Sequence, residues 1–462
     1  MLLTFKDIQA ATNGTIIMCT HDEWVKGIST DSRKAKEYDL FIPLLGERFN
    51  GHDYIKDAMD KGIKTLLVSQ LNDTIQSLQN VNVILVQDTL KALQDLSKFN
   101  ISQYHIPKIG VTGSTGKTST KDLIYSVLKQ KYNVLRNEGN FNNHIGLPLT
   151  VNLLDSAHEA VVLEMGMSHP GEIDVLADIV RPNIAIITNI GLSHIENLKT
   201  QENILKAKME ITNYFKEDHV LIVNGDDRLL KQTLDSKPHY TKYLVGIGEP
   251  NHYRAIHIKD LGLSGITFDV VIENQEIPFK LRVPGYHNIY NALLAIAVGI
   301  LMNIDIDLIQ EGVWQFKGSK MRLNVTMSND HIKIIDDAYN ASPDSMRAAL
   351  AVLNNIDAHR KIAILGDMLE MGEYAEEGHY NVGEEVFEKA IDILITVGKN
   401  AEFIAKGAMD RGLSSKNIFI CKNNKEAIDQ LCRLLRAGDA ILIKGSRGMK
   451  MEEIVEYVQE RS

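Results

Sequence analysis

Residues 113–119 have the types and spacing needed to hold phosphate groups: Gly-Ser-Thr-Gly-Lys-Thr-Ser. Glycines let the backbone curl with its N–H groups pointing inward, a lysine can reach the outer phosphates, and a hydroxyl can bind Mg²⁺. The helix that we expect to begin near Lys117 adds only about half a positive charge at its N-terminus. A triphosphate would therefore also need the lysine and a metal ion.

This pattern is shorter than the general phosphate loop GxxxxGK[ST], because Val111 stands where that pattern has its first glycine. An apolar run at 106–111 and an amphipathic run at 123–128 predict a strand, a turn and a helix. A Gly/Ser-rich turn without a ligand is the alternative interpretation. The expected phosphate contacts are Gly113, Ser114, Thr115, Gly116, Lys117, Thr118 and Ser119.

Two further polar residues follow apolar runs. Glu164 comes directly after 160–163, and His194 lies on the loop after 184–187. Carboxyl ends of parallel strands meet at one edge of a sheet, so both side chains are expected beside the phosphate loop. Glu164 is suited to bind magnesium, although each residue alone could be an ordinary surface residue.

Three residues farther along carry weaker signals. Lys208 lies within a helical segment, 202–215, which alone predicts a solvent-exposed position. Asn288 and Asn291, three residues apart, share one face of a predicted helix. An amide donor and acceptor could match the adenine edge, but capping or packing explains the two asparagines equally well.

Polar clusters recur after strands in the last third of the chain. Arg322 could bind a phosphate with two hydrogen bonds. Residues 336–340, Asp-Asp-Ala-Tyr-Asn, follow a predicted strand. The loops at 366–368 and 444–448 follow two more predicted strands, and the second has the glycine and cationic residues of an anion site. Each could also be an ordinary turn.

Short apolar runs separated by helix-length stretches place these residues in an α/β fold. We expect three domains: a small α/β unit at 1–88, a central parallel sheet with the phosphate loop at 89–316, and a Rossmann-like doubly wound sheet at 317–462. The junctions near Asp88 and Gly318 are candidate hinges. The expected strands lie at 40–43, 65–68, 83–86, 160–163, 184–187, 220–223, 332–335, 362–365, 393–397, 418–420 and 440–443.

Composition excludes several classes of protein. A net charge of −10 argues against a general nucleic-acid or membrane-surface binder. The three cysteines lack CxxC spacing and cannot all pair, so neither a disulfide framework nor a thiolate zinc site is indicated. The longest apolar run, 292–302, is too short for a membrane span and predicts a buried helix. We expect a cytoplasmic protein.

Seven motifs together resemble the Mur ligases of bacterial cell-wall synthesis along the whole chain. Within this family the resemblance is to the branch that adds D-alanyl-D-alanine to UDP-N-acetylmuramoyl-tripeptide. The motifs are GSTGKTS (113–119), GNFNNHIGLPLT (139–150), LEMG (163–166), GYHNIYNA (285–292), DDAYNASPDSM (336–346), LGDMLEMGEYAEEGH (365–379) and KGSRGMKMEEI (444–454).

The resemblance implies a two-magnesium site. Lys117 and Thr118 would hold the ATP phosphates and one Mg²⁺, with Glu164 as a further ligand of that ion. Lys208 would be carbamylated by carbon dioxide, and the carbamate would hold a second Mg²⁺ together with His194.

The resemblance also assigns the remaining contacts. Asn288 and Asn291 would lie beside adenine, and Arg322 and Asp337 would reach the phosphates and ribose of ATP. Residues 29–55 resemble the UDP-sugar-binding module of the family. The candidate UDP-substrate contacts are Ser32, Arg33, Asn142 and Asn143, and the candidates on the dipeptide side are Tyr339 and Asn340.

The implied reaction is ATP-driven amide formation through an acyl phosphate, with release of ADP and phosphate, in peptidoglycan precursor synthesis. A monomer that closes its C-terminal domain by a motion near Gly318 is expected. His144 and Ser342 depart from the family pattern and bear on fine specificity. Folylpolyglutamate synthase, which lacks the N-terminal module, is the nearest alternative, and a phosphate-loop nucleotide switch is a second.

Overall fold

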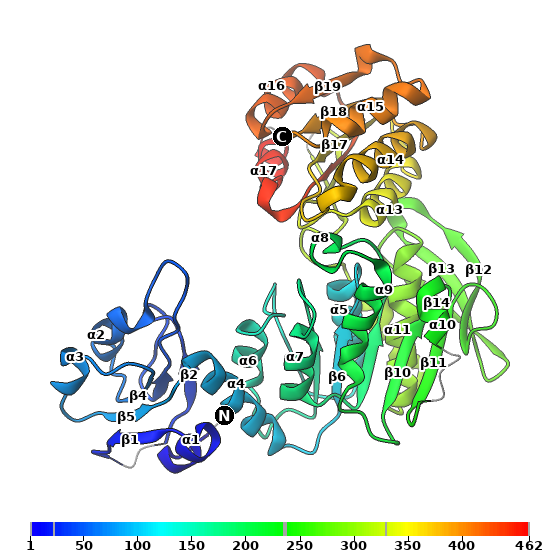
Figure 1. Cartoon of the computed structure of the whole chain (residues 1–462). Helices are drawn as coiled ribbons and strands as arrows, with labels where there is room; N and C mark the ends of the chain where they lie inside the picture. The colour runs from blue at the N-terminus through cyan, green and yellow to red at the C-terminus, as the bar shows by residue number, and fades with distance from the viewer. Residues whose placement is uncertain (1, 22–23, 234–237, 329, 461–462) are drawn as a thin grey trace.

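The computed structural model describes residues 2–21, 24–233, 238–328 and 330–460, which form three α/β units in chain order (Figure 1). Each unit is built on its own sheet. The central unit lies at the corner of a bent arrangement, with the N-terminal unit beside it and the C-terminal unit beyond its other end. The central unit therefore lies between the other two units.

The N-terminal unit contains a five-stranded sheet in the order β1-β5-β4-β3-β2. Strand β1 is antiparallel to β5, and the other neighbours are parallel. The three expected strands correspond to β3, β4 and β5. The bounds are β1 Thr15–Met18, β2 Gly27–Ser29, β3 Asp39–Phe41, β4 Thr65–Val68 and β5 Asn82–Leu85, with helices α1 Phe5–Thr12, α2 Ile55–Met59 and α3 Asp73–Gln76.

Helix α4 (Thr89–Ser102) joins the first two units. Asp88 directly precedes the helix, and its carboxylate accepts hydrogen bonds from the N–H groups of Leu90 and Lys91 and so caps it. Leu93 and Leu96 pack in the N-terminal core, whereas Ile101 packs in the core of the central unit. The junction is thus a packed helix rather than a flexible linker.

The central sheet has nine strands in the order β14-β13-β12-β11-β10-β9-β6-β8-β7. The expected parallel sheet is present from β7 to β12, and two antiparallel strands extend its edge. The alternating burial of β13 fits a strand with one face on the core. Bounds are β6 Lys108–Thr112, β7 Val134–Arg136, β8 Ala160–Glu164, β9 Ile184–Ile187, β10 Val220–Asn224, β11 Thr241–Gly246, β12 Tyr253–Asp260, β13 Ile266–Ile272 and β14 Gln275–Leu281.

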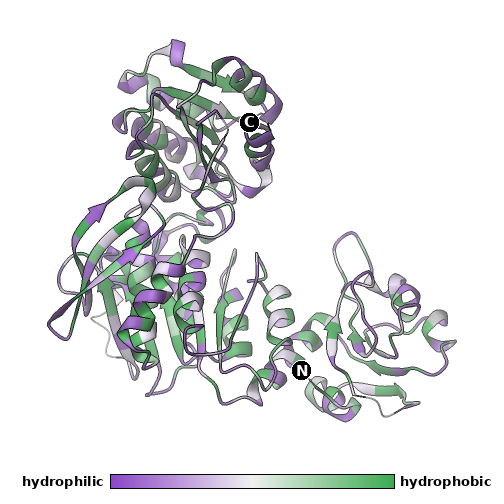
Figure 2. Cartoon of the chain, turned by 180° about the vertical axis from the view of Figure 1, so that it is seen from behind, coloured by the Kyte–Doolittle hydropathy of each residue, from purple (hydrophilic) through white to green (hydrophobic). Residues whose placement is uncertain are grey.

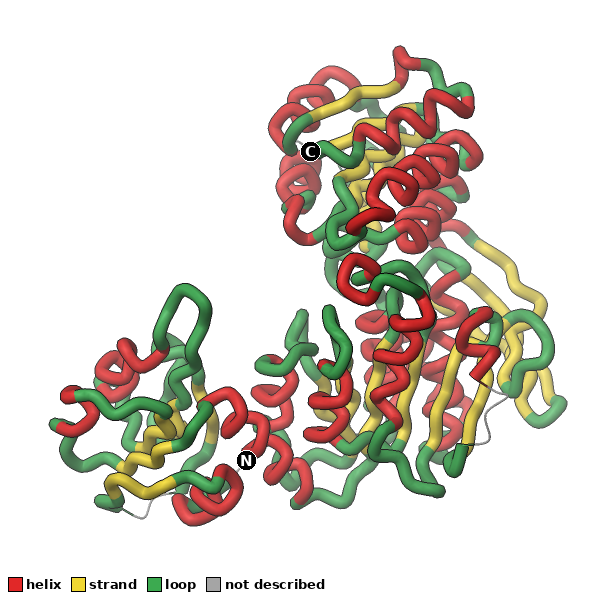
Figure 3. The backbone as a smooth tube through the Cα atoms, in the orientation of Figure 1, coloured by secondary structure: helices red, strands yellow, loops and turns green. Residues whose placement is uncertain are grey.

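Helices cover both faces of this sheet (Figure 3). Helix α11 contains the apolar run at 292–302 except its last residue and is buried, as predicted. No described helix has the length and apolar composition of a membrane span. Bounds are α5 Lys117–Leu128, α6 Gly146–Val151, α7 Glu172–Val180, α8 Ile195–Leu198, α9 Gln201–Met209, α10 Arg228–Gln232, α11 His287–Leu301 and α12 Ile306–Gln315.

The C-terminal unit has a six-stranded sheet, β15-β16-β20-β17-β18-β19, which is parallel apart from β15. All five expected strands are present. The strands are β15 Asn324–Met327, β16 Lys333–Asp337, β17 Lys361–Gly366, β18 Ile393–Val397, β19 Ile418–Cys421 and β20 Ala440–Lys444. The helices are α13 Pro343–Asn354, α14 Ala375–Glu388, α15 Glu402–Arg411, α16 Asn424–Leu434 and α17 Glu452–Glu460.

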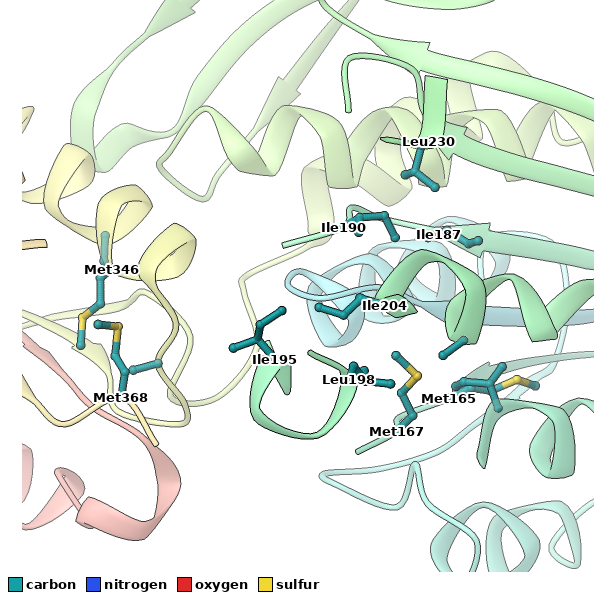
Figure 4. Packing of buried hydrophobic residues seen from close by; sticks show 14 of the residues in the cluster. Met165, Met167, Ile187, Ile190, Ile195, Leu198, Ile204, Leu230, Met346 and Met368 are labelled. Atoms are coloured by element: carbon teal, nitrogen blue, oxygen red, sulfur yellow. The ribbon is translucent and has the colours of Figure 1, made fainter. Parts of the chain in front are cut away.

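Apolar residues concentrate on the strands and on the helix faces that cover them (Figure 2). One hydrophobic cluster continues from the central unit into the C-terminal unit. Ile195 and Leu198 belong to it from one side, and Met346 and Met368 from the other (Figure 4). The two units therefore share a packed contact.

Candidate active site

The phosphate loop connects β6 to α5, and its two glycines adopt conformations that other residues avoid. Gly113 has φ +150°, and a Cβ atom there would lie 1.8 Å from Thr188 Oγ1. Gly116 has φ +76°, and a Cβ there would lie 2.8 Å from Asn291 Oδ1. Both positions therefore require glycine. The predicted strand, turn and helix beginning at Lys117 are confirmed.

The segment after β9 holds this loop in place. Thr188 Oγ1 donates to the Thr115 carbonyl at 2.5 Å, and Asn189 Oδ1 accepts the Thr115 N–H at 2.9 Å. Asn189 Nδ2 also donates to Thr115 Oγ1 at 2.6 Å. Sequence reasoning missed Thr188 and Asn189, although their position directly after an apolar strand is a recognisable signal.

Lys117 folds back over the loop that it follows. Its ammonium donates to the carbonyls of Gly113 at 2.8 Å and Ser114 at 3.3 Å. Burial lowers the pKa of Lys117, and the nearby Glu164 carboxylate opposes that shift. The side chain is thus placed where a cation can face phosphate groups held by the loop.

Glu164 is the last residue of β8, and only 2% of it is exposed. Thr118 Oγ1 donates to Oε2 at 2.8 Å, and Asn142 Nδ2 donates to Oε1 at 2.7 Å. Asn137 fixes the Glu164 backbone through hydrogen bonds at 2.9 and 3.0 Å. A hydroxyl and a buried carboxylate side by side are hard oxygen ligands, and this pair fits Mg²⁺. Sequence reasoning missed Asn137.

His194 follows β9 and Glu164 ends β8, and these two strands flank β6 on either side. The expectation that both residues lie at the edge of the sheet beside the phosphate loop is therefore confirmed. His194 precedes α8 and has a left-handed backbone with φ +63°. Its Nδ1 atom lies 2.5 Å from Oε2 of Glu370, which belongs to the C-terminal unit.

Lys208 is buried, with 1% exposure, so the expectation of a solvent-exposed position is wrong. It shares one helical face with Ile204, Ala207 and Ile211, all packed in the core. No hydrogen bond or ion pair joins its ammonium to the part of the chain that the structure describes. Burial lowers the pKa of Lys208 well below its ordinary value, and the positive charge of Lys117 adds to this.

Asn288 and Asn291 form a hydrogen-bonded chain at the start of α11. Asn288 Nδ2 donates to the Pro284 carbonyl at 2.7 Å, and Asn291 Nδ2 donates to Asn288 Oδ1 at 2.9 Å. Thr120 Oγ1 donates to Asn291 Oδ1 at 3.0 Å. Both asparagines are buried, and they link α11 to the helix after the phosphate loop.

Residues of the C-terminal unit lie opposite the phosphate loop across the cavity described below. Lys444 Nζ donates to Asp337 Oδ2 at 2.6 Å and to the Asn340 carbonyl at 2.8 Å, and both charged side chains are buried. The Arg322 guanidinium stacks on the Tyr339 ring at 4.3 Å. The expected anion site at 444–448 thus includes a lysine whose ammonium is already paired with a carboxylate.

A cavity of about 610 Å³ lies between the central and C-terminal units, and most of the predicted site residues line it. His144 and Ser342 also line it, and Ser342 caps α13 through a capping box with Ser345. The predicted residues in the lining are Ser114, Thr115, Gly116, Lys117, Ser119, Asn142, Asn143, Glu164, His194, Asn288, Asn291, Arg322, Asp337, Tyr339 and Asn340.

Gly113, Thr118 and Lys208 are not among the residues that line this cavity. Thr118 lines a neighbouring cavity, to which Arg322 and Tyr339 also contribute. Ser32 and Arg33 are in the N-terminal unit, where Arg33 is exposed and binds Asp31 through two hydrogen bonds of 2.9 Å. The structure does not bring these two residues to the cavity.

Family models match three consecutive parts of the chain. They are described as the catalytic domain of the Mur ligase family at 25–100, the Mur ligase middle domain at 111–299, and the glutamate ligase domain of Mur ligases at 321–447. A UDP-N-acetylmuramoyl-tripeptide–D-alanyl-D-alanine ligase of Bacillus subtilis (strain 168) is 40% identical over 459 residues, covering 99% of this chain and 98% of the relative.

The chain belongs to the Mur ligase family. Solved structures agree with the sequence comparison. MurF from Acinetobacter baumannii superposes with a TM-score of 0.91 at 29% identity, covering 100% of this chain and 99% of that one. MurF ligase from Thermotoga maritima in complex with ADP gives a TM-score of 0.82 at 26% identity, covering 94% and 97%. The three sheets of this chain are thus those of a Mur ligase from end to end.

Proposed function

We propose that this chain joins D-alanyl-D-alanine to UDP-N-acetylmuramoyl-tripeptide with hydrolysis of ATP to ADP and phosphate. The observation that carries the proposal is the full-length similarity to ligases of that name, at 40% identity to the Bacillus subtilis relative. The cavity between the units supports it, because one wall is a phosphate loop and the other supplies Arg322 and Tyr339.

In this proposal the loop and Lys117 bind the ATP phosphates. Asn288 and Asn291 lie on the adenine side, and Arg322 and Asp337 reach the phosphates and ribose. The terminal carboxylate of the tripeptide attacks the γ-phosphate and displaces ADP, which gives an acyl phosphate, and the dipeptide amine then attacks the acyl carbon. Collapse of the tetrahedral adduct releases phosphate.

Two Mg²⁺ ions would accompany ATP, one held by Thr118 and Glu164 and the other by His194 and a carbamate on Lys208. The metals would neutralise repulsion between the carboxylate and the triphosphate. The burial and lowered pKa of Lys208 support the carbamate, because only the neutral amine can attack carbon dioxide. A carbamate would also turn a buried amine that has no hydrogen-bond partner among the described residues into an anion that a metal can bind.

We assign the UDP moiety to the N-terminal unit around Ser32 and Arg33, with Asn142 and Asn143 on the central side, and the dipeptide to Tyr339 and Asn340. Closure of the C-terminal unit near Gly318, whose φ is +92°, would shield the acyl phosphate from water. We propose a monomer acting in the cytoplasm, and domains that divide at residues 88 and 316.

The direct test is mass analysis of acid-quenched reactions. The protein is incubated with ATP, D-alanyl-D-alanine and UDP-N-acetylmuramoyl-tripeptide carrying either diaminopimelate or lysine as third residue. We expect one pentapeptide product and equimolar ADP. Product from a folate and glutamate instead would favour folylpolyglutamate synthase activity, and ATP hydrolysis indifferent to both substrates would favour a nucleotide switch.

A further inference from the structure

A turn of the C-terminal unit docks on α8 of the central unit. The Glu196 N–H donates to the Glu370 carbonyl at 3.3 Å, and the Tyr374 hydroxyl donates to the Lys199 carbonyl at 3.5 Å. A Cβ on Gly372 would lie 3.2 Å from the Glu196 Cα, so the two backbones approach closely. Ile195 and Met368 pack beside this contact (Figure 4).

Within this contact the Glu370 carboxylate faces His194. Oε2 of Glu370 lies 2.5 Å from His194 Nδ1, which is buried and has no aligned hydrogen bond within the described ranges. Both residues have left-handed backbones, with φ +61° at Glu370 and +63° at His194. Such conformations are uncommon outside glycine, and here they turn the two side chains toward each other.

Hydrogen bonds to His379 and Ser446 hold the turn that carries Glu370. The Met368 N–H donates to His379 Nε2 at 2.8 Å, and the Leu369 N–H donates to Ser446 Oγ at 2.8 Å. His379 is fully buried, and its Nδ1 lies 2.6 Å from the Ala375 carbonyl. The Glu370 carboxylate therefore belongs to a turn whose backbone is held by hydrogen bonds.

We propose that Glu370 is a positioning residue that orients His194 as a metal ligand across the domain boundary. A carboxylate that accepts the N–H of one imidazole nitrogen fixes the tautomer and leaves the other nitrogen for the metal. With Glu370 at Nδ1, the nitrogen left for the metal is Nε2. This proposal rests on the proposed function, specifically on a metal bound by His194.

Glu370 and His194 lie in different units, and this has a consequence for metal binding. His194 belongs to the central unit, but its partner arrives only when the 367–374 turn of the C-terminal unit is docked on α8. The affinity of the His194 metal site thus depends on the relative position of the two units. Movement of the C-terminal unit away from α8 weakens that site.

Mn²⁺ binding measured by electron paramagnetic resonance tests the proposal, because it counts bound ions without turnover. The full-length protein is titrated with Mn²⁺ in the presence of ADP and bicarbonate. We expect two ions in the wild type and loss of one in His194→Ala. In Glu370→Gln the affinity for that same ion should fall about 10- to 100-fold, the usual cost of removing an outer-shell partner.

Glu373→Gln is the matched control, because Glu373 is exposed on the same turn and the change in charge is identical. It should bind both ions as the wild type does. Hydrogen exchange of the Glu196 and Met368 amides in Glu370→Gln should show that the turn stays folded. A purely structural role would loosen those amides and leave the affinity for Mn²⁺ unchanged.

Two results would overturn the proposal. They differ in whether the two-metal part of the proposed function fails as well. If His194→Ala loses an ion but Glu370→Gln binds both with wild-type affinity, only the role of Glu370 fails. If the wild type binds a single ion that His194→Ala does not affect, the two-metal part of the proposed function fails with it.

Discussion

Thr118 Oγ1 donates a hydrogen bond of 2.8 Å to Glu164 Oε2 and so ties the first turn of α5 to the end of β8. Asn142 holds the other carboxylate oxygen at 2.7 Å. Because the carboxylate is buried and engaged at both oxygens, its orientation is set before any ligand binds. Preorganisation of this kind lowers the cost of placing a metal beside a triphosphate.

Replacing this carboxylate with an amide tests its role as a ligand. Glu164→Gln keeps the size of the side chain but removes its charge and one acceptor oxygen. We expect kcat to fall at least about 100-fold at saturating Mg²⁺, because metal stabilisation of the transition state is worth several kcal/mol. Thr118→Ser, which retains the hydroxyl, should stay within a few-fold. Wild-type kcat in Glu164→Gln would exclude the carboxylate as a ligand.

Gly113 offers a test of the phosphate loop itself. In Gly113→Ala the new methyl would lie 1.8 Å from Thr188 Oγ1, so either the loop or Thr188, the residue after β9, must move. We expect ADP affinity, measured by calorimetry, to fall at least about tenfold. Gly171→Ala is the control, since Gly171 also has a positive φ, +85°, but nothing lies within 4 Å of its Cβ position. Equal ADP affinities in both variants would contradict a specific role for the loop.

Lys208→Ala should abolish turnover and leave the protein folded, because the change removes a buried amine without a hydrogen-bonding partner among the described residues. A carbamate cannot form on alanine, but a small carboxylate such as formate can enter the space and supply its oxygens. Partial recovery of kcat with added carboxylate is the expected readout. Full activity of Lys208→Ala without any addition would refute the carbamate.

The sequence predicted the most buried parallel strands of each sheet, because such strands appear as continuous apolar runs. The short edge strands β1, β2, β7 and β15 were not predicted, since they have few residues and mixed burial. The antiparallel strands β13 and β14 were not predicted either, for a related reason. Polar residues interrupt the apolar ones in both strands, so neither forms one continuous apolar run.

Site residues that directly follow strands, such as Glu164 and His194, were predictable from that position. Lys208 was not, because its burial depends on which face of α9 meets the core. The spacing of Ile204, Ala207 and Ile211 around it was the available signal. Glu370 lay in a recognised motif, but only the packing of two units against each other shows that it faces His194.

His287 gives a pH dependence whose sign can be worked out. Burial lowers its pKa to about 4, against the attraction of Asp337, so the folded state excludes a proton that the unfolded chain binds below about pH 6.5. Stability is therefore lost as pH falls from about 6.5 to 4, by up to about 3 kcal/mol.

Urea unfolding at pH 7 and pH 4.5 measures this loss. His287→Gln should lose less stability over that interval than the wild type, because glutamine does not titrate. The control is His331→Gln, since His331 is exposed and its removal should leave the loss unchanged. An identical loss in His287→Gln and the wild type would contradict the burial of a neutral imidazole.

Asp337 and Lys444 form a buried pair that a double-mutant cycle can resolve. Lys444→Met leaves the Asp337 carboxylate buried without its 2.6 Å partner and should cost about 3–5 kcal/mol of unfolding free energy. Asp337→Asn should cost less, because burial already lowers the pKa of Lys444 and the amine can shed its proton. Combining the two should recover about 0.5–3 kcal/mol relative to their sum. Strictly additive losses in urea unfolding would mean that the pair contributes no coupling, and that Asp337 is held toward the cavity by its backbone rather than by Lys444.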